Sequence, residues 1–553
     1  MEMFGDVRVD DYYWLRDDSH SNPEILSYLK AENDYTNQSM SSVKQFEDQL
    51  YAEMVARTKE EVGISVPIRR GSYYYYERTL VGKDYKLHCR RLITNDTCSP
   101  SVYDVMPTGP EASAEHVILD ENIKAQGHEH YYLGAFRPSP NNKLIAYAED
   151  TKGDGIYTVY VIDADKGTAI GNPLKRVSVE IQDFQLFSGY VAICEKENAL
   201  QKVTVYSLPQ MGEEIGPLQN GRAIDFVDPI YSVSTEESQF SSNILRFSYS
   251  SMKTPISIYD YDMTLGISVL KKIQQIPGGF ESSDYLTERK WAVSTDGTRV
   301  PISILYKKNL VKLDGFDPLW QHGYGSYGAS LSPRFDPSVF SLVDRGFIYA
   351  IAHIRGGGEM GRKWHEDGML LNKRNTFTDF IACAEYLIEN KYGSKEKLCI
   401  TGGGLLIGAV LNMRPDLFKA AVLDYPFVDV VTSLLDPTIP STTAQREELG
   451  DPRKEEYYYY IKSYSPVDNV RAQNYPNILV NSDFYEAYIL YSDAAKFVAK
   501  LRATKTDDNM ILFNCKLTER HYSKTERDEY LNDTAFSYAF IMKMLDLAPH
   551  VSS

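Results

Sequence analysis

The sequence lacks any long apolar stretch. No window approaches the ~20 apolar residues that a helix needs to cross a bilayer, and no N-terminal run joins a basic start to an apolar segment. Cysteine is scarce and scattered, with six residues in 553 and no Cys-x-x-Cys pair. This pattern argues against a disulfide framework and a zinc knuckle. We therefore expect a soluble protein of a reducing compartment, the cytoplasm. We expect no cofactor.

Positive charge is also in short supply. The chain has 59 Lys and Arg residues against 76 Asp and Glu residues, which gives a formal net charge of -17. Nucleic acids and acidic membranes are bound through cationic surfaces, so neither is expected as a main partner. The acidity suits a site for basic ligands or, more simply, serves the solubility of the surface.

The length of the chain predicts two domains of different type, because 553 residues exceed one ordinary core. Residues 1–50 carry apolar side chains at irregular helical spacing, which predicts one or two amphipathic helices. Residues 51–287 change to a period of two, and residues 288–553 alternate between strand and helix patterns.

The region 51–287 contains short alternating runs separated by turn clusters such as DTKGDG. The clearest runs are at residues 71–78, 143–147, 156–162, 202–206, 244–248 and 256–261. Many short strands without an intervening helix predict a sandwich, a barrel or a propeller. At about 40 to 45 residues per four-stranded blade, the region has room for about five blades.

The alternation of strand and helix patterns in residues 288–553 predicts a doubly wound, mostly parallel sheet that is covered on both faces. Its organising stretch is Lys397 to Met413, KLCITGGGLLIGAVLNM, which has the pattern of a buried strand, a glycine turn and a helix entered directly from that turn. A second strand is expected at 420–423. In a hydrolase such a turn exposes a nucleophilic serine. This turn contains no serine.

Two positions fit the chain order of nucleophile, acid and histidine that doubly wound hydrolases follow. Glu486 follows the expected strand 478–480, although Asp483 lies three residues earlier and either carboxylate is compatible with a solvated role. His521 follows the expected strand 510–514, where a surface histidine is the alternative.

The motif HGYGSYG at residues 322–328 follows another expected strand. It offers backbone N–H groups and the Tyr324 hydroxyl to an oxyanion hole, or it forms a tight glycine turn with packed aromatic rings. The pair His128 and His130 lacks a third ligand at a fitting spacing, so we expect no metal site there.

The chain resembles a known family roughly from Val7 to Leu545, and six segments carry the resemblance. They are YYWLRDD, VPIRRGSYYYY, HGYGSYG, AHIRGGGEMGRKWHEDG, NTFTDFIACAEYL and LNMRPDLFKAAV. Together they are similar to the prolyl oligopeptidases, and most of all to oligopeptidase B. The resemblance implies an α/β-hydrolase domain at 288–553 on which the helical segment 1–50 packs, and a β-propeller at 51–287 that limits access to short peptides. It also implies a serine peptidase that is monomeric and has no cofactor, whose relatives cleave short peptides after Arg or Lys.

The chain departs from this family in length at two places. Relatives carry seven blades, whereas this chain passes from a second-blade pattern near Ile162 to late-blade patterns by Gln201, so we expect a propeller shortened by about two blades. Where relatives have Gly-Gly-Ser-Ala-Gly-Gly, the chain runs from Gly402-Gly403-Gly404 straight into Leu405. The turn is three residues shorter and has lost the nucleophile.

The resemblance assigns the other catalytic positions residue by residue. Glu486 stands in the slot of the catalytic acid, Tyr488 replaces the arginine that grips substrate, and Tyr324 is the oxyanion tyrosine. His521 remains as the base, but residues 518–520 read Thr-Glu-Arg where relatives have Gly-Ala-Gly.

The loop that binds the P1 side chain of the substrate is also altered. Glu447 keeps one of two family carboxylates, Gln445 replaces the other, and Arg446 adds a charge that repels a basic P1 side chain. The expected partners are short peptides, with basic peptides among the candidates.

Three hypotheses follow. The chain is a serine-type peptidase by descent that is weakly active or inactive, with Thr401 as the nearest hydroxyl and Cys399 expected to be buried. Alternatively it is a non-catalytic protein that binds peptides in the cleft between propeller and hydrolase domain. The third hypothesis is a defective splice product or gene model.

Overall fold

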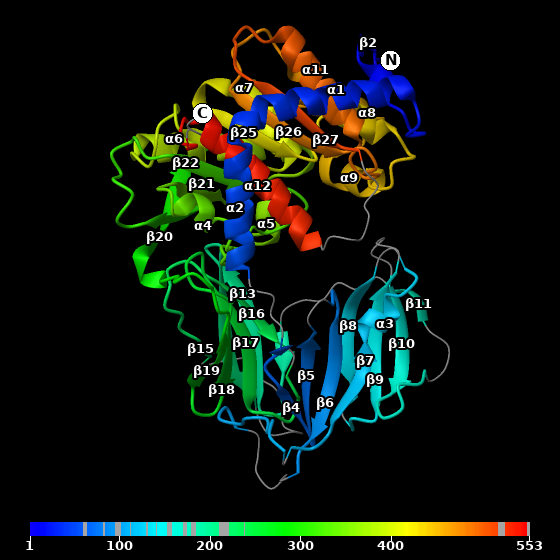
Figure 1. The fold of residues 1–553 in the computed structure, drawn as a ribbon, viewed down its shortest axis with the longest axis vertical. Coiled ribbons are helices and arrows are strands. Elements are labelled where there is room, and N and C mark those ends of the chain that lie inside the picture. Colours follow the sequence, from blue (N-terminus) through cyan, green and yellow to red (C-terminus); the bar gives the residue numbers. More distant parts are fainter. Residues whose placement is uncertain are drawn as a thin grey trace.

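The computed structural model describes residues 1–549 except 59–62, 81–82, 95–100, 111, 129–130, 140, 152–156, 170–173, 178–183, 209–220, 237 and 518–525. Within these ranges the chain forms an α/β part, shown in the upper half of Figure 1, and an all-β part below it. No helix in the described ranges is both long and apolar enough to cross a membrane.

The α/β part is built on one eight-stranded sheet, in the order β20-β21-β23-β22-β24-β25-β26-β27. The strands are β20 (Tyr285–Val293), β21 (Arg299–Lys307), β22 (Leu319–Gly323), β23 (Ile348–Ala352), β24 (Leu398–Gly402), β25 (Ala420–Asp424), β26 (Asn477–Asp483) and β27 (Ile511–Lys516). The pairings of β20 with β21 and of β21 with β23 are antiparallel, and the others are parallel. The expected doubly wound, mostly parallel sheet is confirmed.

Successive side chains of each strand point to opposite faces of this sheet, so both faces carry apolar side chains. Helices cover both faces. On one face α2 (Lys44–Arg57), α4 (Phe340–Val343) and α12 (Glu526–Met544) share a core with Cys399 of β24. On the other face α6 (Arg374–Glu389), α7 (Gly404–Met413), α8 (Val430–Leu435), α10 (Glu455–Lys462) and α11 (Tyr491–Thr504) share a core with Ile400. Figure 1 shows α2 and α12 side by side on the first face.

The N-terminal residues belong to the α/β part. The short strands β1 (Glu2–Met3) and β2 (Asp6–Val7) precede α1 (Pro23–Met40), which lies along β27. Asn33 of α1 exchanges two hydrogen bonds with the backbone of Cys515, at 2.7 and 2.8 Å. These bonds use backbone groups of β27 that no further strand pairs with in the sheet, so α1 covers this edge.

The all-β part consists of antiparallel sheets in sequence order. The first sheet contains β3 (Gly63–Ile64), β4 (Ile68–Arg70), β5 (Tyr73–Thr79), β6 (Lys86–Leu92) and β7 (Glu115–Asp120), and the second contains β8 (Tyr132–Pro138), β9 (Leu144–Asp150), β10 (Tyr157–Asp163) and β11 (Leu174–Val177). The third sheet contains β12 (Phe184–Leu186), β13 (Tyr190–Glu197), β14 (Leu200–Ser207) and β15 (Arg222–Ala223). The fourth sheet contains β16 (Ser232–Glu236), β17 (Ile244–Ser250), β18 (Ser257–Asp262) and β19 (Ile267–Ile273). A short helix, α3 (Glu121–Lys124), follows β7. The described residues thus form four propeller blades, and the expectation of about five was wrong by one.

The four blades are linked in an arc. The first and second blades share one apolar core, and the third and fourth share another. Arg246 of the fourth blade donates to the backbone carbonyl of Val66, next to the first blade, at 2.9 Å. Figure 1 places β8 and β10 on the opposite side of the all-β part from β13 and β15. The segment where the sequence predicts missing blades, between Ile162 and Gln201, contains β11 and β12.

Candidate active site

The turn from β24 into α7 has no room for a side chain at two of its three glycines. A Cβ atom at Gly402, which has a φ of 155°, would lie 2.0 Å from the carbonyl oxygen of Gly323. A Cβ atom at Gly404 would lie 2.2 Å from Cα of Pro426. The backbone N–H of Ile407 already donates to the carbonyl of Gly403 at 3.0 Å, so the helix starts directly at the turn. No protruding elbow is formed.

Tyr324 lies next to this shortened turn. A Cβ atom at Gly403 would lie 3.1 Å from Cδ2 of the Tyr324 ring. Burial, with a contribution from the negative charge of Glu448, raises the pKa of Tyr324, so its hydroxyl stays protonated and able to donate a hydrogen bond. The structure therefore brings together the predicted oxyanion tyrosine and the turn where a nucleophile would be expected.

The two nearest alternative nucleophiles differ in their surroundings. Cys399 is fully buried, as the sequence predicts, and burial raises the pKa of its thiol, which disfavours the reactive thiolate. Thr401 is half-buried at the end of β24, opposite His322 of the neighbouring strand β22. Of these two residues, Thr401 is therefore the one that lies nearer to the turn and the more exposed.

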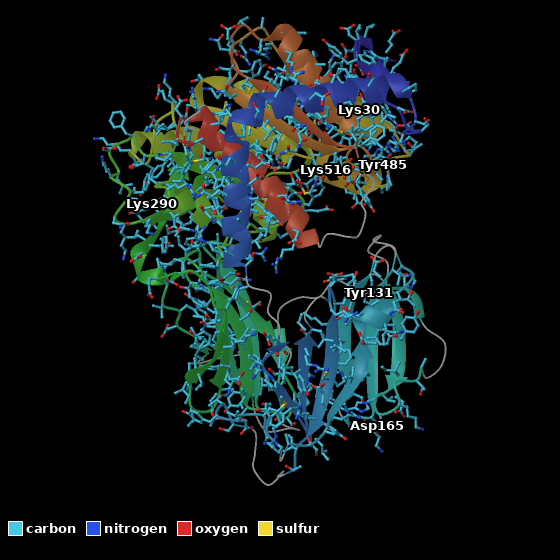
Figure 2. The ribbon with its side chains drawn as sticks, in the orientation of Figure 1. Lys30, Tyr131, Asp165, Lys290, Tyr485 and Lys516 are labelled. Atoms are coloured by element: carbon cyan, nitrogen blue, oxygen red, sulfur yellow. The ribbon has the colours of Figure 1, made fainter. Side chains whose placement is uncertain are left out.

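The loop after β26 carries the predicted acid. Asp483 is buried and accepts a hydrogen bond from the backbone N–H of Tyr485 at 2.9 Å. Glu486 is half-buried and accepts one from the backbone N–H of Tyr488 at 3.0 Å. The side chains of Tyr485 and Tyr488 are exposed, and Figure 2 shows Tyr485 beyond the end of the sheet strands. Of the two carboxylates considered from the sequence, Glu486 is the one with access to solvent.

His521, the predicted base, lies outside the described residues, as do residues 518–520. The role of His521 as the base, paired with Glu486, therefore remains a prediction. His130 of the histidine pair is likewise outside the described residues. Among those that are described, no group of three or more His, Cys, Asp or Glu side chains could hold a metal ion.

The predicted substrate residues lie on α9 (Thr442–Leu449), close to the acid loop. Ser441, just before this helix, donates to the carbonyl of Tyr488 at 3.1 Å. Gln445 is buried and Glu447 is exposed. The guanidinium group of Arg446 donates to the backbone carbonyl of Leu434 at 2.8 and 2.6 Å, which fixes the position of the charge that was expected to repel a basic P1 side chain.

One buried acid of this site was missed from the sequence. Glu448 of α9 lies between Nε2 of His365 at 2.7 Å and Nζ of Lys373 at 3.3 Å. His365 belongs to α5 (Arg362–Glu366), and Lys373 precedes α6. Helical spacing in the sequence could have indicated Glu448, because it lies three residues after Gln445 and therefore on the same face of α9.

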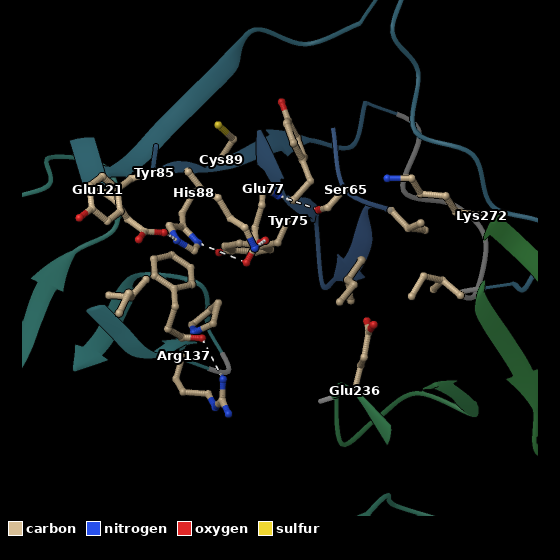
Figure 3. A pocket seen from close by; sticks show the side chains of 18 of the residues that line it. Ser65, Tyr75, Glu77, Tyr85, His88, Cys89, Glu121, Arg137, Glu236 and Lys272 are labelled. Atoms are coloured by element: carbon tan, nitrogen blue, oxygen red, sulfur yellow. Dashed lines mark hydrogen bonds and ion pairs between the residues drawn. The ribbon is translucent and has the colours of Figure 1, made fainter. Parts of the chain in front are cut away.

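A cavity of about 870 Å³ lies in the all-β part, between the first, second and fourth blades (Figure 3). His88 contacts Glu121 on one wall at 2.7 Å, and Glu236 projects from the opposite wall. None of the lining residues belongs to the turn, the acid loop or α9. The cavity is therefore separate from the candidate active site.

Comparisons with known proteins identify both parts. A model described as "Prolyl oligopeptidase family" matches residues 333–548. A model described as "Prolyl oligopeptidase, N-terminal beta-propeller domain" matches in two pieces, residues 1–182 and 176–274. The two pieces overlap at residues 176–182, between the second and third blades, as expected if blades are missing there.

Two relatives and a solved structure cover almost the whole chain. Dipeptidyl aminopeptidase BI from Pseudoxanthomonas mexicana is 32% identical, with 98% of this chain and 94% of the relative covered. Protease 2 from Moraxella lacunata is 29% identical, with coverage of 98% and 96%. Oligopeptidase B from Leishmania major superposes with a TM-score of 0.80 at 28% identity, with coverage of 98% and 95%. The first alignment runs over 692 positions, so parts of that relative have no counterpart in these 553 residues.

Proposed function

The chain belongs to the prolyl oligopeptidase family of serine peptidases, and we propose that it is a weakly active or inactive member that has kept the peptide-binding surfaces of a peptidase. The observation that carries the proposal is the turn Gly402–Gly404, which contains no nucleophile. Loss of the nucleophilic serine lowers kcat on the order of a millionfold, and only substrate binding and oxyanion stabilisation remain.

The roles of the other site residues are part of this proposal. His521 is the base and Glu486 stands in the slot of the acid, while Tyr324 donates to the oxyanion. A peptide substrate contacts Glu447, Gln445 and Tyr488. We also propose a functional division into a helical segment at 1–50, a propeller at 51–287 and a catalytic-type domain at 288–553.

A fluorophosphonate probe is expected to leave the chain unlabelled, because the probe requires an activated serine or threonine hydroxyl. The measurement is intact mass after incubation with excess probe, beside a family member that has a complete Gly-Gly-Ser-Ala-Gly-Gly turn as positive control. Stoichiometric labelling that disappears in Thr401→Ala would assign the nucleophile to Thr401 and refute the proposal.

The second candidate function is peptide binding without cleavage. It is supported by the exposed tyrosines Tyr485 and Tyr488 of the acid loop and by the exposed Glu447 of α9, since Ser441 just before α9 donates to the carbonyl of Tyr488. Aromatic faces and a carboxylate together favour an arginine or lysine side chain, through cation–π and ionic contacts.

A short peptide with blocked ends and a central arginine is therefore expected to bind with measurable heat in titration calorimetry. Its citrulline analogue, which has the same shape without the charge, is expected to bind more weakly. Glu447→Gln should weaken binding of the arginine peptide by up to about fivefold, since exposed ion pairs are worth at most ~1 kcal/mol. Absence of heat for the arginine peptide at high micromolar concentration would count against peptide binding.

A further inference from the structure

A buried lysine joins the substrate helix to the loop that carries Tyr324. The ammonium group of Lys373, whose side chain is 1% exposed, donates to the carbonyl of Gly325 and to the hydroxyl of Ser326, both at 2.7 Å. The same nitrogen lies 3.3 Å from the carboxylate of Glu448 on α9. One cation thus contacts two separate elements of the candidate active site.

The carboxylate of Glu448 is also shared. One of its oxygens contacts Nε2 of His365 at 2.7 Å and the other contacts Lys373, and the Glu448 side chain is 3% exposed. Glu448 lies one residue from Glu447 and three from Gln445, the residues proposed to contact substrate. Glu448 thus links α9 directly to the Lys373 ammonium, and His365, which also lies beside Gly328 of the Tyr324 loop, contacts the same carboxylate.

Stability alone does not account for this ion pair. Burying two charges costs about as much free energy as their attraction returns, so a well-packed apolar side chain would stabilise the fold equally well or better. The Tyr324 loop also has other attachments, since the backbone N–H of Gly328 donates to the carbonyl of Gly356 at 3.0 Å. The contact of Lys373 with Glu448 adds a link to α9 that these attachments do not provide.

We propose that Lys373 and Glu448 are positioning residues that couple the substrate helix α9 to the Tyr324 loop, so that a side chain bound against α9 holds that loop in place. This inference rests on the proposed peptide site. A peptide that contacts both elements gains affinity when they are fixed relative to each other, because less ordering remains to be done on binding.

The coupling is expected to depend on pH between about 7 and 9. The charged group that faces Lys373 is Glu448, with His365 behind it, and the hydroxyls of Tyr324, Tyr327 and Tyr464 interact electrostatically with the same Glu448. Burial lowers the pKa of Lys373 to about 8, whereas burial raises the pKa values of Tyr324 and Tyr464. Lys373 therefore loses its charge, and the attraction to Glu448 weakens, as the pH rises through about 8.

The test measures the affinity of the blocked arginine peptide by calorimetry at about pH 7 and about pH 9. The parent protein is expected to bind about tenfold more weakly at the higher pH, a typical coupling between two sites. Lys373→Arg, which stays charged at both values, should retain the affinity at pH 7 and lose the pH dependence. Lys373→Met and Glu448→Gln should bind about tenfold more weakly at both values.

The matched control is Lys363→Met, which removes a lysine that is 84% exposed and pairs with Asp367 at the surface. It should behave like the parent at both pH values. The coupling is refuted if Lys373→Met and Glu448→Gln, both shown by circular dichroism to be folded, bind with the affinity and the pH profile of the parent.

Hydrogen exchange without peptide separates this inference from the proposed function. If the parent binds no peptide, the proposed function fails, and the coupling is then judged by exchange alone. Lys373→Met should speed exchange of backbone amides in both residues 323–328 and α9, whereas Lys373→Arg should leave both unchanged. Equal exchange in parent and Lys373→Met would overturn the coupling.

Discussion

Restoring the missing residues of the turn between β24 and α7 is expected to make the chain react with a fluorophosphonate probe at the new serine. Insertion of Ser-Ala-Gly between Gly403 and Gly404 recreates the Gly-Gly-Ser-Ala-Gly-Gly sequence of the family. The strand, the helix and Tyr324 are already in place around the turn. The inserted residues must project outward, because Pro426 fills the space beside Gly404.

Hydrolysis of an arginyl ester should rise with the insertion by on the order of a thousandfold or more. A nucleophile is worth up to about a millionfold in kcat, and the changes at Glu486 and Tyr488 reduce the gain. The control is insertion of Ala-Ala-Gly, which restores the length of the turn without a hydroxyl and should remain inactive. A folded Ser-Ala-Gly variant that neither reacts with the probe nor hydrolyses the ester would show that the loop around His521 has also lost its function.

The elements around the turn could be predicted from sequence because local patterns determine them. The strand expected from Leu398 and the helix expected after the glycines were found as β24 and α7, since an apolar run and a glycine turn are sufficient signals. The blade count was less accurate because it was estimated from length. The region 51–287 also contains the end of α2 and the segment between β19 and β20, which belong to no blade.

The interactions within the candidate site could not be predicted in the same way. Glu448 meets Lys373 and His365 across 75 and 83 residues of chain, and no local pattern encodes such a contact. The orientation of Arg446 was missed because its partner is a backbone carbonyl, that of Leu434, which the sequence does not mark. Residue identities gave the candidate positions, whereas the tertiary fold decides which of them face solvent.

Replacing Arg8 by alanine is expected to destabilise the chain by about 3–5 kcal/mol, the cost of removing one partner from a buried ion pair. The Arg8 guanidinium contacts Asp429, Asp468 and the hydroxyl of Thr432, and the Asp429 side chain is fully buried. Among the residues that the structure describes, Lys496, at 3.0 Å, then remains as the ion-pair partner of Asp429. The measurement is denaturant-induced unfolding of parent and variant followed by circular dichroism.

The loss in Arg8→Ala should be larger at about pH 8 than at about pH 5. Burial and the neighbouring Asp429 raise the pKa of Asp493 to about 7. Asp493 thus binds more protons in the folded than in the unfolded chain between about pH 4 and 7, so its contribution to stability falls as the pH rises through that range. Above pH 7 the carboxylates of Asp429 and Asp493 are both ionised and repel each other. Without the charge of Arg8, less positive charge remains to offset this repulsion.

The matched control for this prediction is Arg362→Ala, which removes an exposed pair with Glu366 and should change the free energy of unfolding by less than about 0.5 kcal/mol. Equal stability of the two variants would mean that the first ten residues are not anchored in the α/β part. A large, pH-dependent loss confined to Arg8→Ala would require a cooperative fold that includes both ends of the chain. That result would exclude the hypothesis of a defective product, because a chain without stable tertiary structure has no buried ion pair to lose.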